Sequence, residues 1–228
     1  GWTVTLEEMA SQVDEGTKFN HEVLEYDPIP TSVPMKSVRM LHLFSGPRRE
    51  GDLEFFMKVY TAAIGILIIV DSIDVMIHES MDMNNDVFFE GLKSAVISGF
   101  YYLMHAGVVC RTWSIARFRK PGPPVLRTRE MLYGLQGLSA KWQARVDNDN
   151  QLFFRTFQLA QIMEGLGGYY AIENPEDVGV PPFPSMFVTK EAERLRLEHS
   201  GFDVKFDQKM FGLEFLKGTQ VLSNVIQL

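Results

Sequence analysis

The chain has 228 residues, of which 46% are hydrophobic and 22% are charged, and its formal net charge is −7. This length and balance favour one large folded domain over a disordered chain. The acidic total argues against a protein that coats nucleic acid with its whole surface, but it is compatible with one basic groove. The single cysteine excludes an internal disulfide, which favours a reducing intracellular compartment. The longest apolar run, residues 62–70, is about half of what a membrane span needs.

The first part of the chain is predicted to be an N-terminal helix and a proline-rich arm at residues 1–36, followed by the main domain at residues 37–228. Thr5 and Glu8 have the spacing of a capping box, which predicts a helix over residues 5–16. Three prolines within residues 26–34 predict an extended linker.

Strands and helices are predicted to alternate through the main domain. Short apolar runs predict buried strands, and apolar residues at the helical period predict helices. The predicted elements are a strand at 37–46, a helix at 52–63, a strand at 65–74, a helix at 86–98, a strand at 100–109, a helix at 149–165, a strand at 168–174, a helix at 189–199, and strands at 202–208 and 219–228. This alternation predicts an α/β fold with a doubly wound, mostly parallel sheet.

Two of these helices have a predicted apolar side. In the helix at 86–98, Val87, Leu92 and Val96 are expected to face the core. In the helix at 52–63, the residues expected to share one side are Phe55, Phe56, Val59, Tyr60 and Ala63.

Small and polar residues follow four of the predicted strands, where open α/β sheets bind their ligands. The first group is the turn Phe44-Ser45-Gly46, where a small residue would let the backbone approach a ligand. Asp71 follows the next apolar run and could accept hydrogen bonds from ribose hydroxyls. An ordinary strand-to-helix turn and a helix cap or solvated carboxylate at Asp71 or Asp74 are the alternative interpretations.

Cys110 follows the third strand at the head of a basic segment. Nearby cations favour a thiolate, the nucleophilic form of cysteine, although a lone cysteine is more often a small buried hydrophobe. The segment also contains Trp113 and Phe118 and predicts a groove that follows phosphates; a solvated charged face is the alternative. Its basic residues are Arg111, Arg117, Arg119, Lys120, Arg127 and Arg129.

Glu173 and Asn174 end the fourth strand, before Pro175. A turn carboxylate is the simple interpretation of Glu173. If it lies near Cys110, a thiolate and a carboxylic acid could act on opposite sides of a planar heterocycle. The five histidines show no ligand spacing, so no metal site is predicted.

Together these segments resemble the DNA cytosine-5 methyltransferase family, in the family's order. LHLFSG is similar to the turn that wraps S-adenosylmethionine, IIVDSID to the second motif and NNDVF to the third. AGVVCRTWS resembles the PPCQxxS nucleophile loop, and AIENPE resembles the ENV motif. FDQKMFGLEFLKGTQVLSN resembles a later family segment, so the resemblance runs from about Ser37 to the C-terminus.

The resemblance implies a Rossmann-like methyltransferase fold with S-adenosylmethionine as cofactor and cytosine in DNA or RNA as substrate. Cys110 would attack carbon 6 of a flipped cytosine, Glu173 would bind and protonate the ring nitrogen, and Asn174 would orient the loop. Phe44, Ser45 and Gly46 would wrap the cofactor. Asp71 would bind its ribose and Asp86 its adenine amino group. The basic loop would contact phosphate or base.

The chain departs from the family pattern at several points. Val108 and Val109 replace the two prolines before the cysteine, and Pro47 follows Gly46. No target-recognition domain follows the later motif, and the segment before Pro34 is a candidate for the missing final helix of the cofactor pocket. These departures support an alternative, in which the chain is a catalytically inactive protein of this fold that serves as a structural or interaction subunit of a larger assembly.

Overall fold

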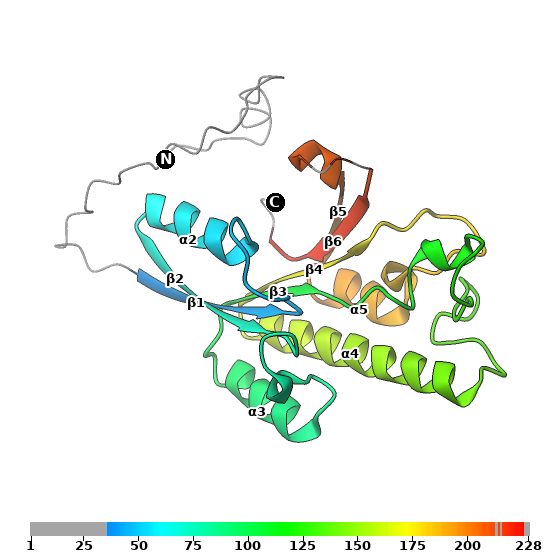
Figure 1. The fold of residues 1–228 in the computed structure, drawn as a ribbon. Helices are drawn as coiled ribbons and strands as arrows, with labels where there is room; N and C mark the ends of the chain where they lie inside the picture. The colour runs from blue at the N-terminus through cyan, green and yellow to red at the C-terminus, as the bar shows by residue number, and fades with distance from the viewer. Residues whose placement is uncertain (1–35, 213, 215, 226–228) are drawn as a thin grey trace. The chain divides into compact units, whose positions relative to one another are not determined.

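A computed structural model describes residues 36–212, 214 and 216–225, which all belong to one compact unit, Met35–Leu228 (Figure 1). The predicted helix at 5–16 and the linker at 26–34 lie outside the described residues. The strands are β1 (Lys36–Leu43), β2 (Ile66–Ile73), β3 (Leu103–Gly107), β4 (Tyr169–Pro175), β5 (Phe202–Asp207) and β6 (Gly218–Ser223). The α-helices are α2 (Leu53–Ala63), α3 (Asp86–Ile97), α4 (Ala140–Gly165) and α5 (Lys190–Glu198). None of the helices in this described part is both long and apolar enough to cross a membrane.

The six strands form one mixed sheet in the order β2-β1-β3-β4-β6-β5. β1 pairs in parallel with β2 and β3, and β3 pairs in parallel with β4. β6 runs antiparallel to both β4 and β5. The predicted α/β class is therefore confirmed. Five strands run in one direction, and β6 alone is reversed, which makes the sheet mixed.

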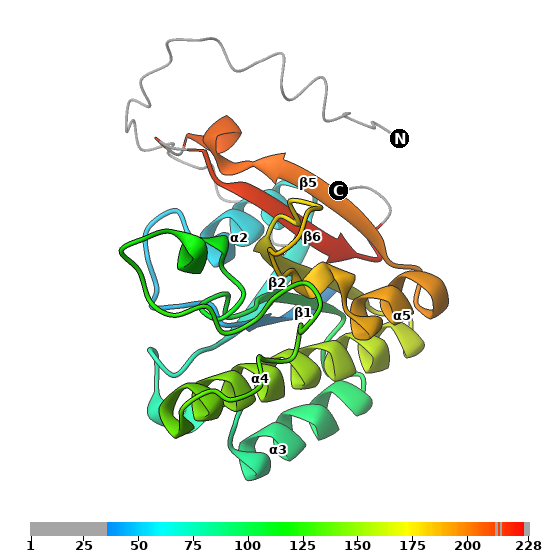
Figure 2. The same ribbon diagram turned by 90° about the vertical axis from the view of Figure 1, so that its right-hand side faces the viewer.

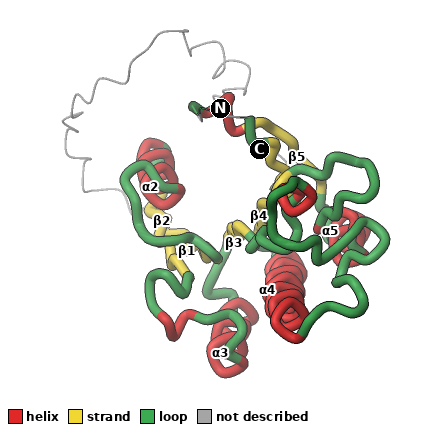
Figure 3. The backbone as a smooth tube through the Cα atoms, turned by 45° about the vertical axis from the view of Figure 1, so that its right-hand side comes forward, coloured by secondary structure: helices red, strands yellow, loops and turns green. Residues whose placement is uncertain are grey.

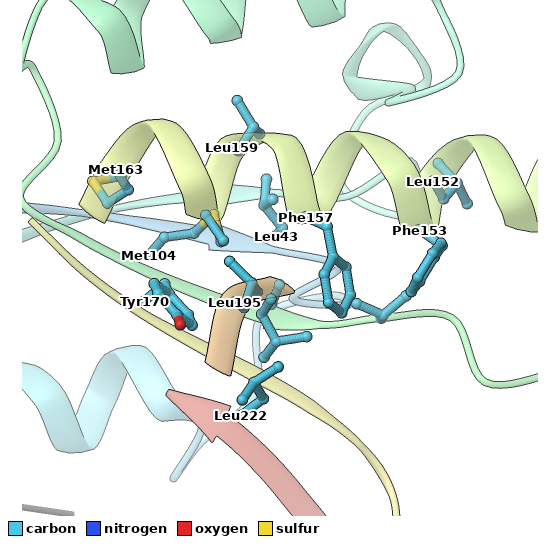
Figure 4. Close-up of a cluster of buried hydrophobic side chains, with 14 of the residues drawn as sticks. Leu43, Met104, Leu152, Phe153, Phe157, Leu159, Met163, Tyr170, Leu195 and Leu222 are labelled. Atoms are coloured by element: carbon cyan, nitrogen blue, oxygen red, sulfur yellow. The ribbon is translucent and has the colours of Figure 1, made fainter. Parts of the chain in front are cut away.

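The helices cover the two faces of the sheet unequally. Figures 1 and 3 show α2 on one side of the strands and α3 and α4 on the other. α4 contacts α3, α5, β3 and β4, and Figure 2 shows it running beside α3 along the sheet. The main core lies on this side, where Leu43, Met104 and Tyr170 from the strands meet Phe157 and Met163 of α4 (Figure 4).

Side-chain caps explain where three helices begin. The Asp52 carboxylate accepts a hydrogen bond from the Phe55 amide at 2.9 Å, and Asn85 Oδ1 accepts from the Val87 amide at 2.9 Å. Thr189 caps α5, because its hydroxyl oxygen accepts from the Ala192 amide. Each cap satisfies an amide that the helix leaves unpaired.

Three details of the sequence prediction are wrong. α4 begins at Ala140 rather than at Asp149, because Asp149 is a buried mid-helix residue and not a cap. Val87 is 84% exposed, and Phe89 takes the core position beside Leu92 and Val96. The aromatic side chains of α2 are not buried among the described residues: Phe56 is 46% exposed.

Candidate functional site

The carboxyl ends of the four parallel strands lie at one edge of the sheet. Leu43 is level with Ile73 on β2 and with Ala106 on β3, and Gly107 is level with Glu173 on β4. The chain order reverses between β1 and β3, which is the switch point where open α/β sheets bind ligands. The polar groups that follow these strands in sequence are therefore neighbours in space.

The turn after β1 is held to the end of β2. The Phe44 amide donates to the Ile73 carbonyl at 2.8 Å, and the Gly46 amide donates to Asp74 Oδ2 at 2.9 Å. Phe44 and Gly46 both have left-handed backbones, with φ of 57° and 68°. Glycine adopts this conformation without steric cost, so the second position suits Gly46. The carboxylate that shapes this turn is Asp74, not Asp71.

A cavity of about 230 Å³ lies at this edge of the sheet. It is lined by Phe44 of the turn, by residues within 73–84 at the end of β2 and after it, including Asp74 and Asn84, and by Val109 and Arg111 after β3. Asn84 Oδ1 is buried and has no hydrogen-bond partner among the described residues. A buried polar atom without a partner costs free energy, so this oxygen is available to a donor from a ligand.

Of the five predicted cofactor residues, Phe44 lines this cavity, and Ser45, Gly46, Asp71 and Asp86 lie outside its lining. Asp71 is bound to Arg39 at 2.9 Å, farther back along β2, and lies beside Tyr101. Burial first, and then the Asp71 charge, raise the pKa of Tyr101. Asp86, the first residue of α3, pairs with Arg155. Both carboxylates are thus already engaged by arginines of the chain itself.

The predicted catalytic residues occupy β4 and the loop after β3. The Cys110 thiol is exposed. Asn174 is buried, and its side-chain amide donates to the Val108 carbonyl at 2.7 Å, while the Val108 amide donates to the Glu173 carbonyl at 3.2 Å. β4 therefore holds the backbone two residues before the thiol.

The Glu173 side chain lies beside a pair of histidines that the sequence analysis did not single out. Its Oε2 is 3.9 Å from His105 Nε2, and its Oε1 accepts from Gln208 Nε2 at 3.2 Å. The rings of His42 and His105 meet edge to face at 5.1 Å, and the Nδ1 atom of each is buried without a partner among the described residues. The only sequence signal was their position inside two apolar strands.

Burial keeps these histidines neutral. It lowers the pKa of His105 to about 3, and the neighbouring His42 adds to this shift. Burial also lowers the pKa of His42, although the Asp52 charge opposes it. A neutral imidazole next to Glu173 can exchange a hydrogen bond with the carboxyl group without adding a charge.

Most cations of the basic loop are bound within the protein. Arg111 pairs with Asp149 at 2.7 Å, and Arg129 pairs with Asp177 at 2.6 Å. Arg117 is buried and donates to the carbonyl of Arg111, and Arg127 is 0% exposed. Arg127 therefore cannot reach a nucleic acid in this conformation.

The cations that remain exposed come from the basic loop and from the start of α4. Arg119 and Lys120 are exposed and form no ion pair among the described residues. The charged groups of Arg117, Lys141 and Arg145 all lie within 6 Å of the centre of the Trp142 ring, at 5.6, 5.4 and 5.9 Å. The sequence analysis missed Lys141 and Arg145 because it began the helix at Asp149.

Within the described residues, no group of three or more His, Cys, Asp or Glu side chains is arranged to bind a metal ion. Comparison of the chain with protein-family models, with curated proteins and with solved structures finds no match.

Proposed function

We propose that this chain is an S-adenosylmethionine-dependent methyltransferase-like domain that acts on cytosine in nucleic acid through Cys110. The observation that carries the proposal is the cavity lined by Phe44, by the segment after β2 and by Val109 and Arg111, the two residues on either side of the exposed Cys110. It lies at the switch point of the sheet, where α/β domains bind nucleotide-like ligands. The family resemblance of the motifs around it supports the same conclusion.

The lining of the cavity fits part of the cofactor. Phe44, Ile73 and Val109 provide apolar walls for an adenine ring, and Asn84 Oδ1 can accept a hydrogen bond from its amino group. Each oxygen of Asp74 accepts from one backbone amide and retains capacity for a ribose hydroxyl. At about 230 Å³ the cavity is below the range of roughly 300 to 1,000 Å³ for drug-sized ligands, so a whole cofactor would extend beyond it.

Cys110, Glu173 and Asn174 do not line the cavity, but they stand at the ends of the adjacent strands β3 and β4 and support chemistry on a planar ring. The cofactor supplies an activated methyl group. The Cys110 sulfur would add to carbon 6 of cytosine while Glu173 gives a proton to the ring nitrogen, which makes carbon 5 nucleophilic. Asn174 would hold the backbone of the cysteine loop through the Val108 carbonyl. Carbon 5 would then accept the methyl group. Loss of the carbon 5 proton to water, return of the ring-nitrogen proton to Glu173 and departure of the Cys110 thiolate would restore the ring.

The exposed cations suggest where the nucleic acid would lie. Residues 111–145 contain eight basic residues and one acidic residue in a chain whose total charge is −7. With four of the arginines engaged internally, Arg119, Lys120, Lys141 and Arg145 are the groups available to phosphates. Trp142 offers an aromatic surface among them.

Calorimetric titration with S-adenosylmethionine tests the pocket. Asp74→Asn should weaken binding about tenfold, because it removes a charge that orders the turn and would bind the ribose. Asp71→Asn is the matched control: it removes the same charge from the same strand region but does not line the cavity, so affinity should stay unchanged. Absence of binding to the wild-type chain, or equal effects of the two variants, would count against the pocket.

Trapping with DNA that contains 5-fluorocytosine tests the thiol. Fluorine at carbon 5 cannot leave as a proton does, so the covalent complex should accumulate. The adduct should disappear with Cys110→Ser, and Glu173→Gln should slow its formation. If no adduct forms with DNA or RNA substrates even though the cofactor binds, the catalytic proposal fails.

A non-catalytic interaction protein is the second candidate. It is favoured by the arginines that occupy Asp71 and Asp86 and by the exposed aromatic residues of α2, since exposed apolar patches often mark protein contacts. Neither cofactor binding nor adduct formation would be expected. The two experiments above therefore separate the candidates.

A further inference from the structure

The residues directly after Cys110 are tied to one buried carboxylate on α4. Arg111 donates to Asp149 Oδ1 through Nε at 2.9 Å and through Nη2 at 2.7 Å. The Thr112 hydroxyl donates to Asp149 Oδ2 at 2.7 Å. The Asp149 side chain is 0% exposed. Each oxygen of this carboxylate thus binds one of the two residues that follow the thiol.

Arg127 completes the attachment from the opposite side. Its Nε donates to the Thr112 hydroxyl oxygen at 3.1 Å, and its Nη1 donates to Asn150 Oδ1 at 2.6 Å. Its guanidinium carbon lies 4.1 Å from the centre of the Trp113 ring. Burial lowers the pKa of Arg127 to about 10, so it remains a cation at neutral pH. Thr112 therefore accepts from a buried cation and gives its only hydroxyl proton to a buried anion.

The backbone at Cys110 is fixed by the same turn. The amides of Trp113 and Ser114 both donate to the Cys110 carbonyl at 2.9 Å. On the preceding side, Asn174 binds the Val108 carbonyl. The cysteine thus lies between an attachment to β4 and an attachment to α4.

We infer that Asp149 is a positioning residue for Cys110, and that it acts through its ion pair with Arg111 and through Thr112, which Arg127 binds from the other side. Buried ion pairs add little net stability, because the cost of removing charges from water offsets their attraction. Their geometry is directional, however, and networks of this kind specify one arrangement. Proline would fix the backbone φ angle before Cys110, but the two residues there are Val108 and Val109. The side-chain network supplies the restraint on the loop instead.

The catalytic meaning of this inference rests on the proposed function, but its structural content can be measured without cofactor or nucleic acid. Because Cys110 is the only cysteine, a nitroxide spin label can be attached to it in the otherwise unmodified chain. Electron paramagnetic resonance then reports the mobility of the loop. Thr112→Val removes the hydroxyl at nearly constant volume, and Asp149→Asn removes the charge.

Both variants should convert a mainly restricted spectrum into one dominated by a mobile component. Thr112→Ser keeps the hydroxyl and should retain the restricted spectrum. Asp147→Asn removes an exposed charge two residues away on the same helix and should leave the spectrum unchanged. Circular dichroism confirms that each variant is folded, and Thr112→Val decides the test if Asp149→Asn does not fold.

The inference is overturned if folded Thr112→Val keeps the wild-type spectrum, or if Thr112→Ser becomes as mobile as Thr112→Val. A chain that binds no S-adenosylmethionine would still show the expected pattern, so failure of the proposed function is a separate result. If the chain is active, Thr112→Val should lower kcat more than it changes KM, because the cysteine would be misplaced while substrate contacts remain.

Discussion

Two connections leave the same edge of the sheet and each lines part of the cavity, and they are held in different ways. The loop after β3 is attached by buried polar side chains, Asp149, Arg127 and Asn174. The turn after β1 is held by two amide hydrogen bonds, from Phe44 to the Ile73 carbonyl and from Gly46 to Asp74, and by its left-handed backbone. The loop that carries the proposed nucleophile is therefore fixed by a network of buried side chains, whereas the turn that would wrap the cofactor is fixed mainly through its backbone.

The largest effect is expected when Asp149, the buried carboxylate that holds the loop after β3, is removed. Asp149→Ala should lower the free energy of unfolding by about 3 to 5 kcal/mol, because Thr112 and Arg111 would lose their acceptor and the buried Arg127 would lose the charge of Asp149 nearby. Urea unfolding measures this change. Asp147→Ala, on the exposed side of α4, should stay within about 0.5 kcal/mol of wild type. A loss at Asp149 no larger than this would mean that the loop is not held by its buried charge.

Acid should lower the free energy of unfolding through His105 on β3. Burial in the folded state lowers the pKa of His105 to about 3, whereas an unfolded histidine titrates near its ordinary pKa of 6.5. Between pH 6.5 and pH 3 His105 is therefore protonated in the unfolded state and neutral in the folded state. The free energy of unfolding falls by about 1.4 kcal/mol per pH unit across this range. At pH 5 the loss from this residue is about 2 kcal/mol.

Unfolding at pH 7.5 and pH 5 isolates this contribution when His105→Gln is compared with wild type. The variant should lose less stability on acidification, while His78→Gln, at an exposed histidine, should behave like wild type. The shift of His42 has the same sign, so the variant should keep part of the acid sensitivity. Identical pH dependence in wild type and His105→Gln would contradict the burial argument.

A smaller effect is expected in the turn after β1, which contains Gly46. Gly46→Ala should cost about 1 to 2 kcal/mol, because alanine is strained at a φ of 68° even though nothing lies within 4 Å of the added carbon. Gly91→Ala is a control of opposite sign: it lies in the interior of α3 with open space around it and should stabilise the protein by about 0.5 to 1 kcal/mol. Melting temperatures of both variants test the difference.

The smallest effect on stability is expected for the exposed cations. Arg119→Gln and Lys120→Gln should each change the free energy of unfolding by less than about 0.5 kcal/mol. In filter binding to DNA across a salt series, each should weaken affinity and reduce the salt slope by about one. Unaltered affinity in the double variant would place any nucleic acid on another surface.

The sequence analysis predicted the ten strands and helices of the main domain and the gathering of their carboxyl-end residues. Those features follow from local periodicity and from the rule that parallel strands share one direction. It could not assign partners: Asp71 is paired with Arg39, and Asp86 with Arg155, through contacts between residues 32 and 69 positions apart. Asp149 stands before the apolar run of α4, a position typical of a helix cap. Only the packing of the folded chain shows that it is a buried residue within the helix.

By itself the sequence determined the alternation of strands and helices and which polar residues follow each strand. These depend on interactions within a few residues along the chain. Tertiary structure decided the order β2-β1-β3-β4-β6-β5, the choice of Asp74 over Asp71 at the cavity, and which arginines remain free. Those outcomes depend on burial and on distant partners, since a charge removed from water must be paired wherever the fold places it.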